Sequence, residues 1–369
     1  MRKYTEIDGN DQAAKILKSN STIEHYAFQC VDFTQFVAEI ENITFRDCLF
    51  LGCKLAKSMR YNLDTSNTLF TSLHVPYGVF RTSLYTPQSL YEGYDWHAPH
   101  TITQSYDSKV YTHYLNTGKR AHDINETLAR TLHDHSMSEA LHDILAKRNE
   151  RDVVAIMGGH ALLRTDPIFR QVVIISKMLT EKGKLMISGG GPGAMEATHL
   201  GAWMAGRSIH EVDEAISILA KSPCFRDNGW LESAFEVIDR FPQYQYESIG
   251  IPTWLYGHEP ATPFATHIAK YFENSLREDG LLTIAMGGVI YTPGSAGTMQ
   301  EIFQDAVQNH YLSFGYASPM AFLGVDYWTS QMPAYSLLET LQNNGRYKNL
   351  LLSITDSEEE IVQSIMDFK

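Results

Sequence analysis

Two stretches of the sequence decide the fold: KLMISGGGPGAME at residues 184–196 and VIYTPGSAGTMQE at residues 289–301. Each begins with a short apolar run that suits a buried strand, continues into a glycine-rich turn and opens a helical pattern. Glycine leaves room for a ligand to approach the backbone, and helix N-termini attract anions. Two such turns in one chain predict a nucleotide site where parallel strands end.

The alternation of strand and helix extends on both sides of these stretches. The run VVAIM at 153–157 ends in Gly158-Gly159, and Pro167 then suits the first position of a helix. Further strands are expected within 248–256, 320–328 and 350–354, and helices over 209–245 and from Thr262-Pro263 to about Arg277. This order predicts an α/β fold, a doubly wound parallel sheet with helices on both faces.

Charge and composition narrow the classes of function. The chain has 369 residues, with 30 Lys and Arg against 43 Asp and Glu, a formal net charge of −13. Such acidity argues against a protein that coats nucleic acid, processes DNA or lies on an anionic membrane, because these need a cationic surface. No apolar run approaches the length of a membrane span, and the N-terminus lacks the apolar core of a signal peptide. We therefore expect a cytoplasmic protein without nucleic-acid or membrane partners.

The first 150 residues follow a different pattern and are expected to form a separate domain, partly β-rich and partly helical, before a domain at 151–369. Between residues 28 and 55 large apolar residues recur every five positions, with a cysteine two residues before two of them. This spacing is similar to that of pentapeptide repeats, whose coils form a square β-helix; an irregular β-rich segment with aromatic core residues explains it equally well. A helix is expected over 123–147.

Neither cysteines nor histidines suggest a metal. The four cysteines (Cys30, Cys48, Cys53, Cys224) are too scattered for a zinc site or a disulfide framework. His133, His135 and His142 lie on the expected helix 123–147 with no cysteine or carboxylate to complete a ligand set, and we expect them on a solvated face. No metal and no cofactor are predicted.

The glycine-rich turns match neither of two common nucleotide motifs. Neither is a GxGxxG dinucleotide fingerprint followed by an acidic residue about twenty positions on, and neither is a GxxxxGK[ST] phosphate loop. Nicotinamide redox chemistry and ATP hydrolysis are therefore disfavoured.

The ordered motifs Gly158-Gly159, SGGGPGAME at 188–196, GIP at 250–252 and PGSAGTMQE at 293–301 resemble those of the Lonely guy (LOG) family. These Rossmann-like nucleotide-binding proteins carry GGGxxGLMG and PGGxGTxxE, and include cytokinin-activating phosphoribohydrolases and nucleotide 5′-monophosphate nucleosidases. The resemblance covers about 150–330, with a helical insertion at 209–245. Ser295 replaces the middle glycine of the second motif, and Ala194 and Glu196 depart from the first.

The resemblance implies hydrolysis of the N-glycosidic bond of a nucleoside 5′-monophosphate, giving free base and ribose 5-phosphate. By motif position, Glu301 and Arg277 correspond to the family's catalytic pair. A carboxylate can stabilise the oxocarbenium-like sugar and orient or deprotonate the attacking water, and an arginine can hold phosphate or ribose hydroxyls. The expected substrate-binding residues are Gly158, Gly159, Gly189, Gly190, Gly191, Gly193, Met195, Glu196, Gly294, Ser295, Ala296, Gly297 and Thr298. His160 and Arg164 follow the first strand and are further residues that could line the pocket.

A second class of function fits the same motifs: a non-catalytic nucleotide-binding sensor or carrier, with the N-terminal domain as its partner surface. Glu301 discriminates between the two, since a sensor needs no carboxylate at the ribose. A homo-oligomer, dimer or higher, is expected, for which an apolar helix 262–277 could supply an interface. The base preference and the role of residues 1–150 stay open at this point.

Overall fold

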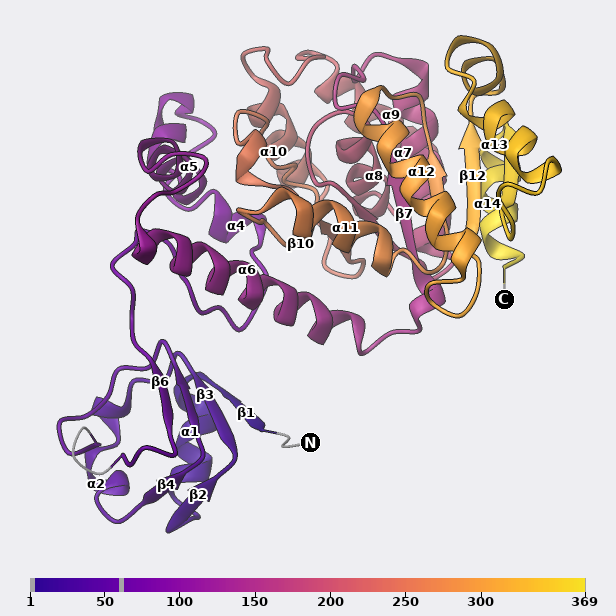
Figure 1. The fold of residues 1–369 in the computed structure, drawn as a ribbon. Coiled ribbons are helices and arrows are strands. Elements are labelled where there is room, and N and C mark those ends of the chain that lie inside the picture. Colours follow the sequence, from indigo (N-terminus) through magenta and orange to yellow (C-terminus); the bar gives the residue numbers. More distant parts are fainter. Residues whose placement is uncertain (1–3, 60–62, 369) are drawn as a thin grey trace. The chain divides into compact units, whose positions relative to one another are not determined.

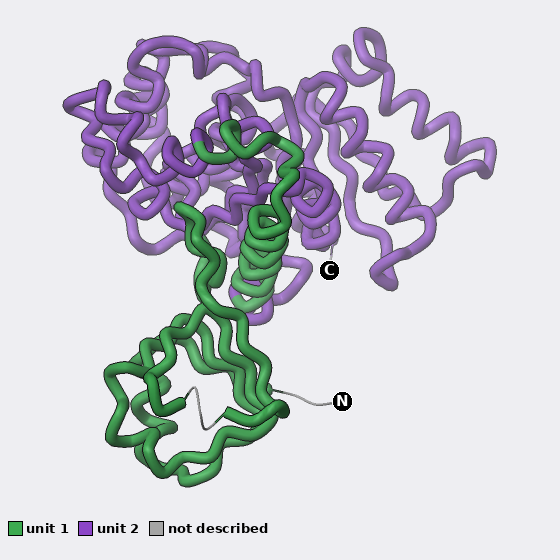
Figure 2. Tube along the Cα trace, turned by 60° about the vertical axis from the view of Figure 1, so that its left-hand side comes forward, with its two compact units in different colours: residues 1–84, 113–143 green, residues 85–112, 144–369 purple. Residues whose placement is uncertain are grey.

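The computed structural model describes residues 4–59 and 63–368, which divide into two compact units (Figures 1 and 2). The first unit comprises residues 4–84, with that gap, and 113–143; the second comprises residues 85–112 and 144–368. The chain passes between the units three times, once between Leu84 and Tyr85 and then inside two helices, α5 (Tyr106–Asn116) and α6 (Ile124–Leu145). The second unit thus includes Tyr85–Thr112, which a boundary at residue 150 assigns to the first.

The first unit is built from short parallel strands that stack as coils. In its four-stranded sheet Thr5 pairs with Tyr26, Ala27 with Leu49 and Leu49 with Thr68, so successive coils are offset by 19 to 22 residues. The sheets have the orders β1-β3-β5-β6 and β2-β4. The elements are β1 (Thr5–Asp8), α1 (Gly9–Leu17), β2 (Thr22–Glu24), β3 (Tyr26–Gln29), η1 (Phe33–Gln35), α2 (Val37–Ile40), β4 (Thr44–Arg46), β5 (Leu49–Leu51) and β6 (Thr68–Phe70).

Aromatic side chains fill the interior of these coils. Phe28, Phe33, Phe45 and Phe50 are all buried, and the rings of Phe28 and Phe50 stack with their centroids 5.5 Å apart. Side chains five residues apart, Phe28 with Phe33 and Phe45 with Phe50, face inward within one coil and pack against each other. Rings 12 to 22 positions apart pack between coils, so the core of this unit combines contacts within a coil with contacts between coils.

Helix α6 buries one of the histidines that we expected on a solvated face. The imidazole of His133 is fully buried, with Nδ1 3.0 Å from a carboxylate oxygen of Asp134 and its ring edge-on to Tyr77. Burial lowers the pKa of His133. His135 and His142 are exposed. The expectation was wrong for His133 because the helix packs a polar stripe, not only its apolar residues, against the rest of the unit.

A seven-stranded, fully parallel sheet organises the second unit, in the order β10-β9-β8-β7-β11-β12-β13. The strands are β7 (Val153–Met157), β8 (Leu185–Ser188), β9 (Ser248–Gly250), β10 (His267–Ile268), β11 (Val289–Tyr291), β12 (Pro319–Leu323) and β13 (Leu351–Thr355). Apart from the two-residue β10, the order is 3-2-1-4-5-6 counted from β7, which is the doubly wound Rossmann-like arrangement. The chain reverses its direction of travel between β7 and β11, so a crevice opens where these two strands end.

Helices cover both faces of this sheet, as expected. Figure 1 shows α11 and α12 in front of it and α7 and α8 behind, and the rear face carries the main aliphatic core, from Val154 and Ile156 to Ile361 and Ile365. The elements besides the strands are α4 (Pro87–Leu90), η2 (Pro99–Gln104), η3 (Glu150–Asp152), α7 (Pro167–Glu181), α8 (Ala194–Trp203), α9 (Ile209–Leu219), α10 (Trp230–Arg240), η4 (Trp254–Tyr256), α11 (Asn274–Ile284), α12 (Ala296–Tyr311), the π-helical turn η5 (Tyr327–Gln331), α13 (Ala334–Asn343) and α14 (Glu358–Met366).

The helix expected from Thr262 to Arg277 does not form, so an oligomer interface cannot be built on such a helix. Residues 262–272 make a turn at 263–264 and then run in a largely extended path, in which β10 pairs with β9. The N–H of Ala269 donates to the carbonyl of Gly250, so backbone groups that a helix would satisfy internally are bonded to a neighbouring strand. Helix α11 begins only at Asn274, which places Arg277 in its first turn.

The segment Tyr85–Thr112 braces this extended path within the second unit. Tyr85 and Ile268 exchange backbone hydrogen bonds of 3.0 and 2.7 Å, and the Tyr91 hydroxyl donates to the carbonyl of Ala261. Asp107 accepts from the buried ammonium of Lys270 at 2.6 Å and from the Trp254 indole at 2.9 Å. Residues more than 140 positions apart thus fix the stretch that follows β9.

No helix in the described residues combines the length and apolar character that a membrane span requires.

Candidate functional site

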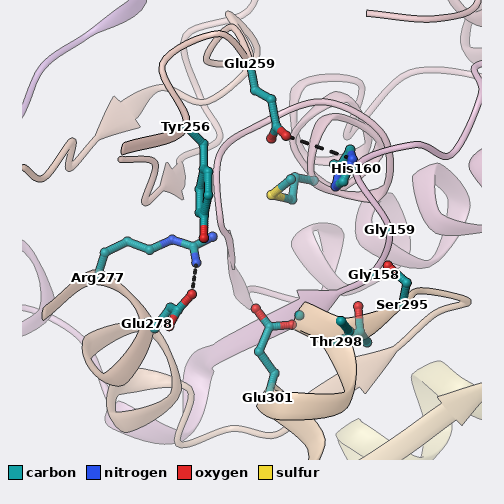
Figure 3. Close-up of a pocket in the computed structure, with 13 residues that line it drawn as sticks. Gly158, Gly159, His160, Tyr256, Glu259, Arg277, Glu278, Ser295, Thr298 and Glu301 are labelled. Atoms are coloured by element: carbon teal, nitrogen blue, oxygen red, sulfur yellow. Dashed lines mark ion pairs between the residues drawn. The ribbon is translucent and has the colours of Figure 1, made fainter. Parts of the chain in front are cut away.

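A cavity of about 330 Å³ lies where β7 and β11 end, at the reversal point of the sheet. Its walls come from the turns after these two strands, the first turns of α8, α11 and α12, and the loop after β9 (Figure 3). The lining residues are Gly158, Gly159, His160, Met195, Tyr256, Glu259, Arg277, Glu278, Ser295, Ala296, Gly297, Thr298 and Glu301. Its size suits a ligand of nucleotide dimensions.

Three glycine-rich turns pack directly on one another below this cavity. The N–H of Gly159 donates to the carbonyl of Pro293 at 3.1 Å, and the N–H of Ala194 donates to the carbonyl of Gly159 at 3.2 Å. A Cβ atom at Gly158 would lie 2.0 Å from the Thr292 hydroxyl oxygen, and one at Gly193, where φ is +69°, would lie 2.4 Å from the Gly159 carbonyl oxygen. These glycines are required by close backbone packing.

The N-terminus of α12 faces the cavity without a side-chain cap. Ser295 stands at the N-cap position but makes no capping hydrogen bond, and Ser295, Ala296 and Gly297 are exposed. The first backbone N–H groups of a helix have no partner within it and carry partial positive charge. This 16-residue helix therefore offers its N–H groups and dipole to an anion in the cavity.

Arg277 reaches the cavity from the first turn of α11. Its Nε donates to the carbonyl of Ile251 at 3.0 Å, and its guanidinium lies 3.6 Å from the carboxylate of Glu278. A Cβ atom at Gly189 would lie 2.4 Å from a terminal nitrogen of Arg277, so the guanidinium rests against the bare backbone of the turn after β8. One edge of the fork is thus fixed, and the other faces the cavity.

Glu301 is a cavity carboxyl with a raised pKa. It lies one turn into α12, and Figure 3 shows it pointing toward the space between Arg277 and Ser295. Burial raises the pKa of Glu301 to about 7, and the neighbouring Glu278 adds to the rise while Arg277 opposes it. Among the described residues no hydrogen bond reaches its carboxylate. A carboxyl with a pKa near neutrality can give or take a proton under ordinary conditions.

The structure brings both residues of the expected catalytic pair, Arg277 and Glu301, into this cavity. It also brings there seven of the expected binding residues: Gly158, Gly159, Met195, Ser295, Ala296, Gly297 and Thr298. Gly189, Gly190, Gly191, Gly193 and Gly294 lie behind the lining residues, where they make room for Met195, Arg277 and Thr298 or for the next turn.

Glu196, expected to bind substrate, is instead part of a buried ion pair. It is completely buried, and its carboxylate accepts from Nε of Arg164 at 2.9 Å. Arg164 is buried too and also donates to Ser222, Trp230 and Ser233. The carboxylate of Glu196 is therefore used to tie helix α8 to the insertion that carries α9 and α10. Arg164 does not line the cavity, whereas His160 does.

Tyr256, Glu259 and Glu278 line the cavity without having been expected there. The first two lie in the segment after β9: Tyr256 ends the short helix η4, within the range 248–256 where a strand was expected, and Glu259 follows in the loop beyond it. Polar and aromatic residues directly after GIP, at the edge where parallel strands end, are the signal that would have identified this loop.

The described residues contain no cluster of three or more His, Cys, Asp or Glu side chains placed to hold a metal ion.

Comparisons with known proteins give likenesses in structure but not in sequence. No family model matches the chain, and no curated protein matches it. Three solved structures are similar, each over 58% of this chain. The molybdenum cofactor binding protein from Rippkaea orientalis is 15% identical, with 95% of its length covered and a TM-score of 0.37. The structural-genomics target TM1055 is 19% identical (98% covered, TM-score 0.38), and the molybdenum cofactor carrier protein from Chlamydomonas reinhardtii is 13% identical (96% covered, TM-score 0.35).

Proposed function

We propose that the protein hydrolyses the N-glycosidic bond of a nucleoside 5′-monophosphate, giving the free base and ribose 5-phosphate. One observation carries the proposal: a half-buried carboxyl, Glu301, with a pKa of about 7 shares a cavity with an uncapped helix N-terminus and with Arg277. An anion-binding helix end alone would suit any phosphate ligand. The carboxyl one turn away adds a group for chemistry beside the bound phosphate.

The phosphate is placed at residues 295–298, where the N–H groups of α12 and the turn at Gly158-Gly159 meet. A ribose extending from that phosphate comes beside Glu301. As the bond from C1′ to the base nitrogen breaks, positive charge develops on the sugar, and an ionised Glu301 stabilises it. Glu301 also takes a proton from the water that attacks C1′, while the departing base keeps the bonding electron pair and takes up a proton from solvent; Glu301 then returns its proton to solvent.

Arg277 acts as a binding group in this scheme. The hydrogen bond to the Ile251 carbonyl holds its guanidinium in place, and its free edge donates to the phosphate or the ribose hydroxyls. It also opposes the rise in the pKa of Glu301, so it favours the ionised carboxylate that the reaction needs.

Replacing Glu301 by Gln tests the assignment. Gln has nearly the same shape but can neither carry the charge nor accept the proton, so we expect turnover to fall by about 10³-fold or more. The measurement is release of base and ribose 5-phosphate from a panel of nucleoside monophosphates. Glu339→Gln, on the exposed side of α13, serves as the matched control and keeps full turnover.

Binding measured on the same panel separates this proposal from its alternative. A protein that binds nucleotides but releases no base from any of them is a sensor or carrier, and that result overturns the hydrolase. Turnover that survives Glu301→Gln shows that another group is the catalytic carboxylate.

A further inference from the structure

We propose that Tyr256 and Glu259 form the base-recognition wall of this cavity and make it select nucleobases that carry an exocyclic amino group over their oxo counterparts. The inference rests on the proposed binding of a nucleoside monophosphate. It assigns a specificity role to the loop after β9, which belongs neither to the phosphate-facing turns nor to the pair Glu301 and Arg277.

Glu259 lies at the end of the cavity away from the phosphate-facing turn. Figure 3 shows it at the opposite side of the view from Glu301 and Thr298, and its Oε2 lies 3.8 Å from where a Cβ of Gly191 would be. In a nucleoside monophosphate the ribose separates the phosphate from the base. With the phosphate at residues 295–298 and the ribose at Glu301, the base is the part of the ligand that reaches Glu259.

The Glu259 carboxylate is available to a ligand. Its Oε1 makes two long ion-pair contacts of 3.9 Å, with Nε2 of His160 (dashed in Figure 3) and with Nε2 of His258; both exceed hydrogen-bond distance, and no described residue donates a hydrogen bond to either oxygen. The side chain is only 18% exposed. A partly buried carboxylate that accepts no hydrogen bond binds a ligand N–H favourably, whereas a ligand oxygen in the same place repels it. An amino group supplies the N–H, and an oxo group in its place presents oxygen to oxygen.

Tyr256 and Met195 supply the apolar surfaces for a flat base. Both line the cavity, and Tyr256 is 43% exposed in the absence of a ligand. The sulfur and terminal methyl of Met195 lie over Gly189 and Gly191, where side chains would come within 2.7 and 2.9 Å of them. An aromatic ring stacks on any base without regard to its edge. Tyr256 therefore contributes affinity, and Glu259 contributes the choice between bases.

The loop that carries these residues is fixed before any ligand arrives. The N–H of Glu259 donates to the carbonyl of Tyr256 at 2.8 Å, and the N–H of Thr262 donates to the carbonyl of Gly190 at 2.9 Å. Trp254, two residues before Tyr256, is bonded through its indole to Asp107. A group held in place rejects the wrong partner because it cannot turn away from it.

Three pairs of nucleotides that carry either an amino or an oxo group at the same ring carbon test the proposal: adenosine and inosine, cytidine and uridine, and guanosine and xanthosine 5′-monophosphates. Affinities are measured by calorimetry on the Glu301→Gln variant, and base release on the wild type. We expect at least one amino member to bind about tenfold or more tightly than its oxo partner, and no pair to be reversed. In Glu259→Gln, whose amide can also donate, that preference falls to about threefold or less.

Two controls define the result. Glu236→Gln, on the exposed surface of α10, keeps the wild-type preference. Tyr256→Ala weakens the binding of all six nucleotides by about tenfold without changing the order of their affinities, whereas Tyr256→Phe binds them as the wild type does.

The outcomes separate the two proposals. Equal affinities within every pair, a reversed pair, or a preference that survives Glu259→Gln overturns the role of Glu259 and leaves the hydrolase untouched. Selective binding with no base release from any nucleotide overturns the hydrolase and supports Glu259. Failure of all six to bind overturns both.

Discussion

At the scale of single residues, Glu301 links the site to the stability of the protein. Its pKa is raised from 4.5 to about 7 in the folded chain, so the folded state holds this proton more tightly than the unfolded state does. Stability is therefore lost as the pH rises from 4.5 through about 7. The loss amounts to about 3 kcal/mol once the carboxyl is ionised.

Glu301→Gln removes this dependence, because the amide does not titrate. We expect the variant to be more stable than the wild type at pH 8 by about 3 kcal/mol, and the difference to shrink toward pH 4.5. Urea unfolding of both proteins across this pH range measures it. A difference that grows on acidification would contradict the assigned pKa. Asp305, also buried with a pKa of about 7, is present in both proteins and cancels from the comparison.

Gly193 gives a second prediction at this scale, with Gly183 as its matched control. Both residues have positive φ, +69° and +89°, but a side chain at Gly183 meets nothing within 4 Å, whereas one at Gly193 meets the Gly159 carbonyl oxygen at 2.4 Å. Gly193→Ala should cost at least about 2 kcal/mol more than Gly183→Ala in unfolding free energy. It should also weaken nucleotide binding, because it forces the turns at 159 and 193 apart. Equal costs would show that the turns can relax.

The cavity residues that could be predicted from the sequence are those that a motif places in a glycine-rich turn or near the start of the helix that follows it. Glu301 and Thr298 follow PGSAG directly, so their place at the cavity follows from the strand–turn–helix pattern. Glu196 stands in an equally good motif position, yet its carboxylate is consumed by Arg164, a partner 32 residues away. The local sequence pattern predicts the backbone position that carries a side chain. The partner with which that side chain bonds depends on tertiary packing.

At the scale of elements, the helix expected over 262–277 shows where pattern fails. Thr262-Pro263 followed by apolar residues is a sound helix start. The segment is instead extended because β9 and Tyr85 offer its backbone groups hydrogen-bond partners. The brace from residues 85–112 comes from so far away in the chain that no local window contains it. The loop that positions Tyr256 and Glu259 was missed for the same reason.

Asp107 tests how much that brace contributes. Removing its carboxylate by Asp107→Ala leaves the buried ammonium of Lys270 without its counter-charge, and we expect a loss of about 3–5 kcal/mol in unfolding free energy. Asp107→Asn, which can still accept from the Trp254 indole, should lose less. Chemical denaturation compares the two. Equal losses would mean that the hydrogen bond from the Trp254 indole adds nothing beyond the charge of Asp107.

At the scale of the whole molecule, most strands of the large sheet were predictable from their apolar runs, and so were the helices on both faces. The two-residue β10 and the three- and four-residue strands of the first unit carry too little pattern to be recognised. These strands form because they pair with strands of neighbouring coils in the first unit and, for β10, with β9. The division of the chain shows the same limit, since each unit is assembled from two separate stretches.

This division predicts the behaviour of fragments. A fragment 151–369 lacks Tyr91 and Asp107, which bond to Ala261 and Lys270, whereas a fragment 85–369 retains them. A loss of about 4 kcal/mol in unfolding free energy lowers the melting temperature of a domain of this size by about 10 °C. We therefore expect 151–369 to melt at least that far below 85–369, as followed by circular dichroism. Matching melting temperatures would show that the second unit does not depend on residues 85–112.

The burial of Glu301 has a consequence for how the whole acidic molecule responds to its ligand. A nucleotide phosphate carries up to two negative charges near neutral pH, and placing them in the cavity of Glu301 makes the ionised carboxylate less favourable. Binding above pH 7 is then accompanied by partial uptake of a proton from solution, and only the complexes in which Glu301 stays ionised can react. The heat released on binding would vary with the ionisation enthalpy of the buffer, and the apparent affinity would fall as the pH rises, although the free phosphate is then more fully charged.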